Sequence, residues 1–176
     1  MGLAYAGIGS RETPADALQR MREIAAMLGD EGWCLRSGGA EGADTAFEQG
    51  LSAHHEREIY LPWKGFGGHG SALCKPSPEA FTLAASMHPA WVRCSRGARS
   101  LHARNCQQVL GRDLDDPVTM VVCWTKHGSG AGGTGQALRI AAQHAIPVFD
   151  LGISLDLADE AIAFADAQRA ARRPER

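Results

Sequence analysis

Hydrophobic and polar positions form two kinds of pattern along the chain. Short, nearly continuous apolar runs are typical of buried strands, and we expect strands over residues 3–8, 33–37, 57–63, 117–125 and 146–151. Longer stretches with apolar residues at helical spacing predict helices over residues 14–32, 45–53, 78–88, 98–110, 134–144 and 155–169. The run over 117–125 is rich in β-branched residues, which suits a central strand buried on both faces.

The alternation of strands with crossover helices predicts the fold class. It indicates an α/β, Rossmann-like, doubly wound fold with a mainly parallel sheet of about five strands and helices on both faces. The chain has 176 residues, of which 44% are hydrophobic, and this fits a single domain. We expect residues 1–170 to form that domain and residues 171–176 to be a frayed tail.

The composition restricts which binding partners and which cellular compartment we expect for the protein. The formal net charge is −2, and only three lysines occur, so the chain lacks the basic surplus of most nucleic-acid binders. Five cysteines without a C-x-x-C pair, and seven histidines without ligand spacing, predict a reducing cytoplasm, no zinc site and no bound metal. The sequence has no signal-peptide pattern and no apolar run of about 18 residues, so we expect a cytoplasmic protein without membrane contact.

Three glycine-rich turns follow predicted strands: "GIGSR" (7–11), "SGGAEGAD" (37–44) and "GSGAGGTG" (128–135). The carboxyl ends of parallel strands share one sheet edge, and a helix amino end with bare glycines lets an anion approach free N–H groups. One glycine-rich loop alone is as consistent with a flexible turn as with a phosphate-binding loop. Three such loops at one sheet edge predict a single phosphate-binding crevice. Its expected ligand-binding residues are Gly7, Gly9, Ser10, Arg11, Ser37, Gly38, Gly39, Gly42, Gly132, Gly133, Thr134, Gly135 and Gln136. The P-loop and G-x-G-x-x-G patterns of familiar nucleotide-binding proteins are absent.

Four motifs carry a family resemblance: "YAGIGSRETP", "RSGGAEGAD", "LHARN" and "GGTGQALRIA". In this order they resemble the Smf/LOG-like Rossmann superfamily, which includes DNA processing protein A and the Lonely Guy phosphoribohydrolases. The resemblance spans roughly residues 3–151 and is strongest to small phage or prophage-encoded members. It implies a Rossmann-like nucleotide-binding fold and pairing of two copies through helices beside the sheet.

The resemblance also implies catalytic residues. Lonely Guy enzymes cleave the N-glycosidic bond of nucleoside monophosphates with an arginine on the helix before the glycine loop and a glutamate just after the threonine of that loop. Arg104 matches the arginine and is followed by Asn105, but Gln136 stands in the place of the glutamate. An amide can neither accept the proton nor supply the negative charge, so Asp44, Glu41 or Glu48 would have to replace it. Asp44 is the strongest of these, although it is equally well read as a helix cap.

Several arginines and tryptophans could either bind the ligand or have an ordinary surface or core position. Arg99 could assist Arg104 with a phosphate, whereas Arg93 and Arg96 read as solvated helix residues. A base could stack near Trp124, or near the loop 62–77 with Trp63, although tryptophan more often packs in a core.

Two functions remain open at this point. The favoured one is a sensor or sequestering protein that binds a nucleotide or another phosphate-bearing small molecule, with no obligatory cofactor. The alternative is a phosphoribohydrolase with Arg104, Asp44 and Glu41 as catalytic residues. Single-stranded DNA binding, as in DNA processing protein A, is a weaker third. The apolar stretch 78–92, with Met87, Trp91 and Val92, predicts a homodimer.

Overall fold

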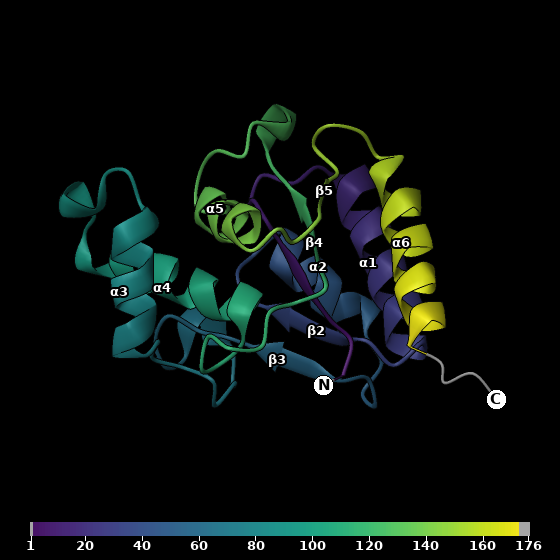
Figure 1. The fold of residues 1–176 in the computed structure, drawn as a ribbon, viewed down its shortest axis with the longest axis horizontal. Coiled ribbons are helices and arrows are strands. Elements are labelled where there is room, and N and C mark those ends of the chain that lie inside the picture. Colours follow the sequence, from purple (N-terminus) through teal and green to yellow (C-terminus); the bar gives the residue numbers. More distant parts are fainter. Residues whose placement is uncertain (1, 173–176) are drawn as a thin grey trace.

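The computed structural model describes residues 2–172 and contains a parallel sheet of five strands (Figure 1). The order β3-β2-β1-β4-β5 is that of a doubly wound fold, which confirms the predicted class. Its strands are β1 (Ala4–Gly9), β2 (Cys34–Ser37), β3 (Arg57–Ile59), β4 (Met120–Trp124) and β5 (Val148–Asp150).

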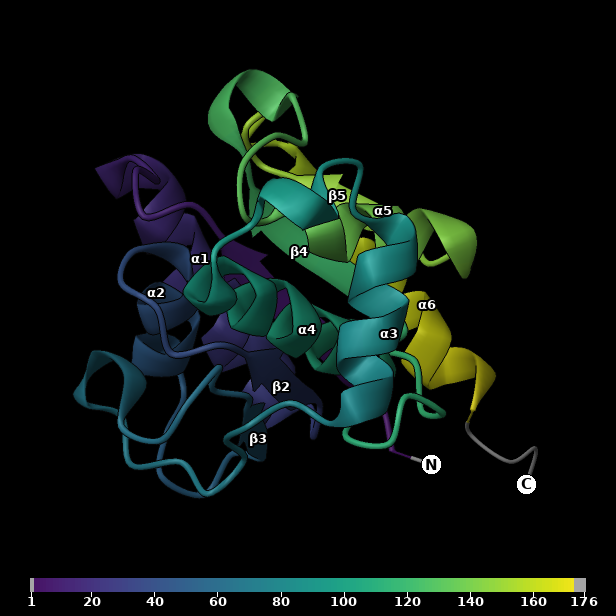
Figure 2. The same cartoon turned by 90° about the vertical axis from the view of Figure 1, so that its left-hand side faces the viewer.

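Helices cover both faces of the sheet (Figures 1 and 2). One face carries α1 (Ala15–Asp30), α2 (Ala43–Gly50) and α6 (Leu157–Ala171). The other carries α3 (Pro78–Met87), α4 (Arg96–Leu110) and α5 (Gly135–Gln143). Short 3₁₀ turns follow in the connections: η1 (Phe66–Gly68), η2 (Trp91–Arg93) and η3 (Lys126–Gly128).

The core has two halves because side chains alternate across the sheet. Tyr5, Met120 and Val122 point into the half beneath α1, α2 and α6. Ala6 and Val121 point into the half beneath α3, α4 and α5. Both sides of β4 are therefore buried, as its apolar run predicts.

Several element boundaries differ from the sequence-based expectation. The strand predicted over 57–63 pairs only as far as Ile59, after which Leu61 forms an isolated bridge with Cys74. The helix predicted from residue 98 begins at Arg96, because the Ser95 hydroxyl accepts a hydrogen bond from the Ala98 N–H at 3.2 Å and caps it. At the carboxyl end α6 extends to Ala171; residues 173–176 of the expected tail lie outside the described residues.

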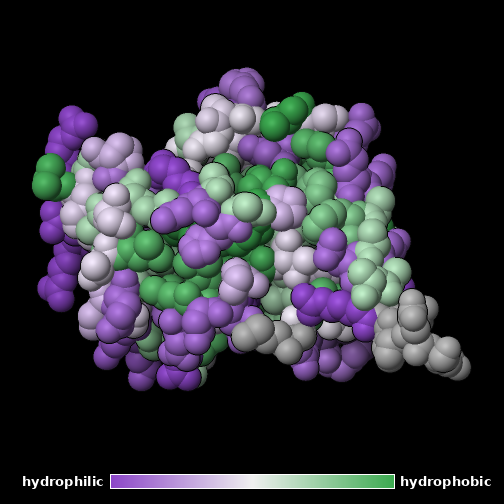
Figure 3. Space-filling view, viewed as in Figure 1, coloured by the Kyte–Doolittle hydropathy of each residue, from purple (hydrophilic) through white to green (hydrophobic). Residues whose placement is uncertain are grey.

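In Figure 3, apolar residues gather toward the middle of the face, and polar residues lie mostly toward its margins. Within residues 2–172, none of the helices combines the length and the apolar character that crossing a bilayer requires.

Candidate functional site

A cleft of about 400 Å³ lies where the strand order reverses between β1 and β4. Such a switch point is where ligands of doubly wound sheets bind. Four segments line the cleft: residues 8–12 at the end of β1 and just beyond it, Ala40 and Asp44 around the start of α2, one side of α4, and residues 131–134 before α5.

Helix α4 contributes Leu101, Arg104, Asn105 and Gln108 to this lining. These residues are spaced three and four apart and therefore form one stripe along the helix. The opposite side of α4 packs into the core through Ala103 and Cys106. The helix thus presents a polar stripe to the cleft while its apolar side fixes its position.

Arg104 and Asp44 form a buried ion pair at this stripe. The Arg104 Nη1 donates to Asp44 Oδ2 at 3.3 Å, and the two side chains are 7% and 3% exposed. Burial raises the pKa of Asp44, while the charge of Arg104 opposes that rise. Burial likewise lowers the pKa of Arg104, against the attraction of Asp44 and with a further lowering from the charge of Arg11. The pair therefore balances two desolvated charges beside the cleft.

Two buried donors in the lining lack hydrogen-bond partners among the described residues. They are Arg104 Nε and Gln108 Nε2. Gly38 leaves room for both side chains, since a Cβ built there would lie 1.4 Å from Arg104 Nη1 and 2.6 Å from Gln108 Nε2. Unpaired buried donors are costly, so a pair of them beside a cleft points to an acceptor that enters from outside.

The glycine loop before α5 forms the opposite wall. Asn105 Nδ2 donates to the Gly133 carbonyl at 2.8 Å and so fixes the loop on α4. Gly132 has a φ of +78°, which favours glycine, and a Cβ built at Gly133 would meet nothing within 4 Å. The backbone here is open to the cleft and leads directly into the amino end of a nine-residue helix.

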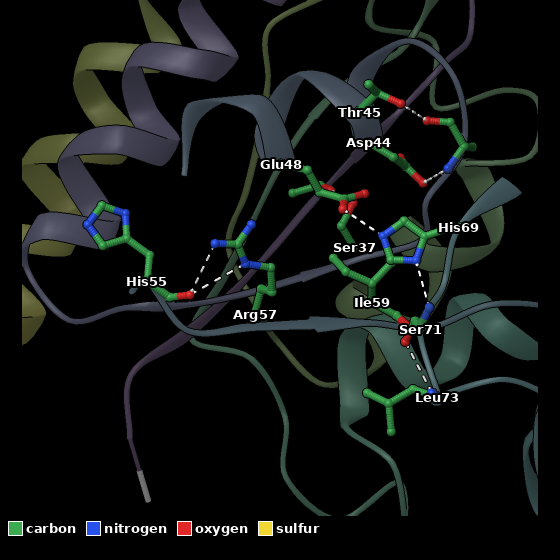
Figure 4. A network of polar contacts seen from close by, with 12 residues as sticks. Ser37, Asp44, Thr45, Glu48, His55, Arg57, Ile59, His69, Ser71 and Leu73 are labelled. Carbon is green, nitrogen blue, oxygen red and sulfur yellow. Dashed lines mark hydrogen bonds and ion pairs between the residues drawn. The ribbon is translucent and has the colours of Figure 1, made fainter. Parts of the chain in front are cut away.

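Hydrogen bonds to the first turn of α2 hold the loop after β2 in place (Figure 4). Asp44 Oδ2 accepts from the Ala40 N–H at 3.4 Å, and the Thr45 hydroxyl donates to the Ala40 carbonyl at 2.8 Å. Farther along α2, Glu48 and the His69 ring are 3.0 Å apart, which directs this carboxylate to the loop after β3.

Nine of the predicted site residues line the cleft together: Gly9, Ser10, Arg11, Asp44, Arg104, Asn105, Gly132, Gly133 and Thr134. Others support the loops instead. The Gly7 carbonyl accepts from the buried Ser37 hydroxyl at 2.7 Å. Gly42, with a φ of +86°, lets the second loop approach the Ser10 carbonyl, and Gly135 lies against the Gly130 carbonyl. Gly38 makes room for Arg104, and Gly39 has a φ of +63° beside Leu61.

Three further predicted residues also lie outside the cleft lining. Gln136 is fully buried; its Nε2 donates to the Ala84 carbonyl at 3.2 Å, and its Oε1 accepts from Arg139 at 2.7 Å. Trp124 is half-buried and packs on the core beneath α1 and α2. Glu41 is exposed at the tip of its loop. Of the carboxylates proposed to replace the family glutamate, Asp44 lines the cleft and Glu41 and Glu48 do not.

Sequence reasoning missed Glu12, Leu101 and Gln108 in the lining. The signal for Leu101 and Gln108 was present, because they are three residues before and four after Arg104 on one helix. Glu12 directly follows the first glycine turn; its side chain is 73% exposed and lies 3.9 Å from Lys126.

Comparisons with known proteins show the fold. No family model matches the chain, and no curated protein matches it either. A solved structure of DNA processing protein A from Helicobacter pylori, described for its single-stranded DNA binding mode, superimposes with a TM-score of 0.57 at 19% sequence identity. The match covers 85% of this chain and 65% of that structure, so the chain spans less than two thirds of its length. The chain therefore shares the Rossmann-like fold of DNA processing protein A.

Proposed function

We propose that the chain binds a small ligand carrying one phosphate group, such as a nucleoside monophosphate, in the cleft at the switch point. The observation that carries this proposal is the pair of unpartnered buried donors, Arg104 Nε and Gln108 Nε2, on two residues of a cleft that is also lined by a glycine loop leading into a helix. A phosphate supplies acceptors for side-chain and backbone N–H groups alike. A cleft of about 400 Å³ falls within the range of small-molecule sites.

The charges of the lining favour a singly phosphorylated ligand over a polyanion. Arg11 and Arg104 are matched by Glu12 and Asp44, so the formal charges of the lining cancel. Attraction for an anion then comes from short-range N–H groups and from the helix dipole, whose effect falls off within one turn. A long polyphosphate would extend into the field of Glu12.

The test is thermal stabilisation by nucleoside monophosphates, because a ligand bound only to the folded state stabilises it. Gly133→Val places a branched side chain in the open space of the cleft and should abolish the shift without unfolding the chain. Gly70→Val is the matched control: it too meets nothing within 4 Å, but it lies outside the lining and should keep the shift. Absence of any shift with wild type, or an equal loss in both variants, would overturn the proposal.

N-glycosidic cleavage is a second candidate, favoured by the position of Asp44 in the cleft beside Arg104. A carboxylate at this place can stabilise a cationic ribose, and loss of such preorganised groups costs roughly 10²–10³ in rate. Incubation with nucleoside monophosphates should then release free base, and Asp44→Asn should suppress the release while binding persists. Gln136→Glu is no test of this chemistry, since Gln136 donates to the Ala84 carbonyl in the core and a carboxylate could not.

Single-stranded DNA binding is a third candidate, favoured by a separate groove of about 830 Å³ between the loop 62–76 and the start of α4. Lys75, Arg96 and Arg99 line it together with Trp63 and Trp91, and no acidic residue does. Cations with stacking aromatic rings suit single strands. Salt-dependent binding of an oligonucleotide that Gly133→Val leaves intact and Trp63→Ala weakens would assign this function to the groove rather than the cleft.

We also propose that the chain acts in a reducing compartment such as the cytoplasm. All five cysteines are free, and two of them are buried. This supports the compartment expected from the sequence.

A further inference from the structure

Three potential metal ligands converge outside the cleft, where α3, η2 and α4 meet. His88 follows α3, Cys94 follows η2, and His102 lies on α4. One ligand atom from each lies within 4.8 Å of the other two. Cys94 Sγ is 3.7 Å from His88 Nδ1, and the rings of His88 and His102 have centroids 4.3 Å apart.

The polar atoms of this cluster are incompletely paired. His102 Nδ1 is buried and has no hydrogen-bond partner among the described residues. Cys94 makes only long contacts, with the Ala90 carbonyl at 3.6 Å and with His88.

We propose that His88, Cys94 and His102 bind one zinc-class divalent ion. In a tetrahedral site, zinc bonds of about 2.3 Å to sulfur and about 2.0–2.1 Å to nitrogen place the two ligand atoms roughly 3.6 Å apart. The observed separation of 3.7 Å between Cys94 Sγ and His88 Nδ1 matches this value. A thiolate with two imidazoles is a donor set that zinc accepts readily.

Binding changes the local bonding in a defined way. The Cys94 thiol gives its proton to solvent as the sulfur–metal bond forms. In the structure, His88 Nδ1 accepts a hydrogen bond from the Ala90 N–H at 3.2 Å. This hydrogen bond breaks when the nitrogen binds the metal. The thiolate reduces the net charge of the bound ion to +1, which limits its repulsion by Arg139.

Three protein ligands leave the fourth position for water. Cys94 also lines the groove of about 830 Å³ described above, so the cluster borders a space that solvent can enter. Zinc sites with three protein ligands and one water are typical of catalytic rather than structural centres.

The test is titration of the reduced, metal-free protein with Co²⁺, followed by displacement with Zn²⁺. One equivalent of Co²⁺ should give the d–d bands of a tetrahedral site together with a thiolate-to-cobalt charge-transfer band, and Zn²⁺ should remove both. Spectra without the charge-transfer band, or absence of binding at micromolar protein, would overturn the proposal.

Substitutions identify the ligands. Cys94→Ser should abolish the charge-transfer band, whereas Cys74→Ser, which changes a half-buried cysteine outside the cluster, should keep it. His88→Gln and His102→Gln should each weaken Zn²⁺ binding by more than the roughly 10–100-fold that loss of an outer-shell partner causes. Circular dichroism confirms that each variant is folded. If Cys74→Ser rather than Cys94→Ser removes the band, or both histidine variants bind as wild type does, the assignment is wrong.

Discussion

At the scale of the residue, the Asp44–Arg104 ion pair is the central feature of the cleft lining. Both side chains are almost fully buried, and their only mutual contact is a single hydrogen bond of 3.3 Å. A buried pair of this kind adds little net stability, but removing one partner leaves an uncompensated buried charge. Its value lies in holding the Arg104 guanidinium beside the cleft.

We therefore expect Arg104→Met alone to lower the free energy of unfolding by about 3–5 kcal/mol. The double variant Asp44→Asn/Arg104→Met should recover most of this loss, because neither charge then remains buried. Urea denaturation of wild type, both single variants and the double variant measures the coupling. Equal stability of the single and double variants would contradict this account.

The same pair predicts a pH dependence. The pKa of Asp44 is already raised above 3.8, and loss of Arg104 removes the charge that opposes the rise. A raised pKa makes the folded state bind the proton more tightly, so the contribution of Asp44 to the stability of Arg104→Met should be most favourable below pH 3.8 and be lost as pH rises through the folded pKa. Urea midpoints of Arg104→Met and of the double variant across this range should converge at acidic pH and separate toward neutrality.

At the scale of the element, close packing of α1 on α2 depends on Gly50. A Cβ built there would lie 2.3 Å from the Arg22 carbonyl and 2.8 Å from the Ala25 Cβ, so the backbones of the two helices would have to separate. Gly97 in α4 is the contrasting case, since its Cβ would make an ordinary contact with Trp63 at 3.9 Å.

The same substitution should thus have opposite effects at the two positions. Gly50→Ala should destabilise the fold by about 1–3 kcal/mol through overpacking. Gly97→Ala should stabilise it by up to about 0.5–1 kcal/mol, because alanine loses less backbone entropy in a helix. Chemical denaturation of both variants checks this, and a stabilising Gly50→Ala would refute the packing argument.

At the scale of the whole molecule, the predicted homodimer remains a proposal. The segment after α3 carries Val92, which is 85% exposed on η2, while Met87 and Trp91 are half-buried. Buried Ala80 and Ala84 show that the inner side of α3 is already occupied by the core, so a partner would have to use the outer side.

Val92→Asp should shift such a dimer toward monomer in sedimentation velocity at micromolar concentration. Ile153→Asp is the matched control, because Ile153 is an aliphatic side chain, 68% exposed, in the loop between β5 and α6. A monomeric wild type would remove the proposal, as would equal dissociation by both variants.

The sequence by itself determined the layered architecture and the glycine loops that line the cleft. Strand and helix periods differ, so the apolar pattern identified each strand and α-helix of residues 2–172, and turn glycines after strands marked one sheet edge. A single contact can decide a boundary: the Ser95 hydroxyl caps α4, which therefore begins at Arg96, two residues before the predicted start.

Only the tertiary structure decided which side chains meet. Gln136 appeared to stand in the site because it follows the glycine loop, yet the rotation of α5 turns it into the core against Ala84. Gln108 enters the cleft because α4 packs with that side outward. His88, Cys94 and His102 have no motif spacing, and only the turn between α3 and α4 brings them together. Local sequence fixes backbone conformation, whereas the direction of a side chain depends on packing between elements distant in the chain.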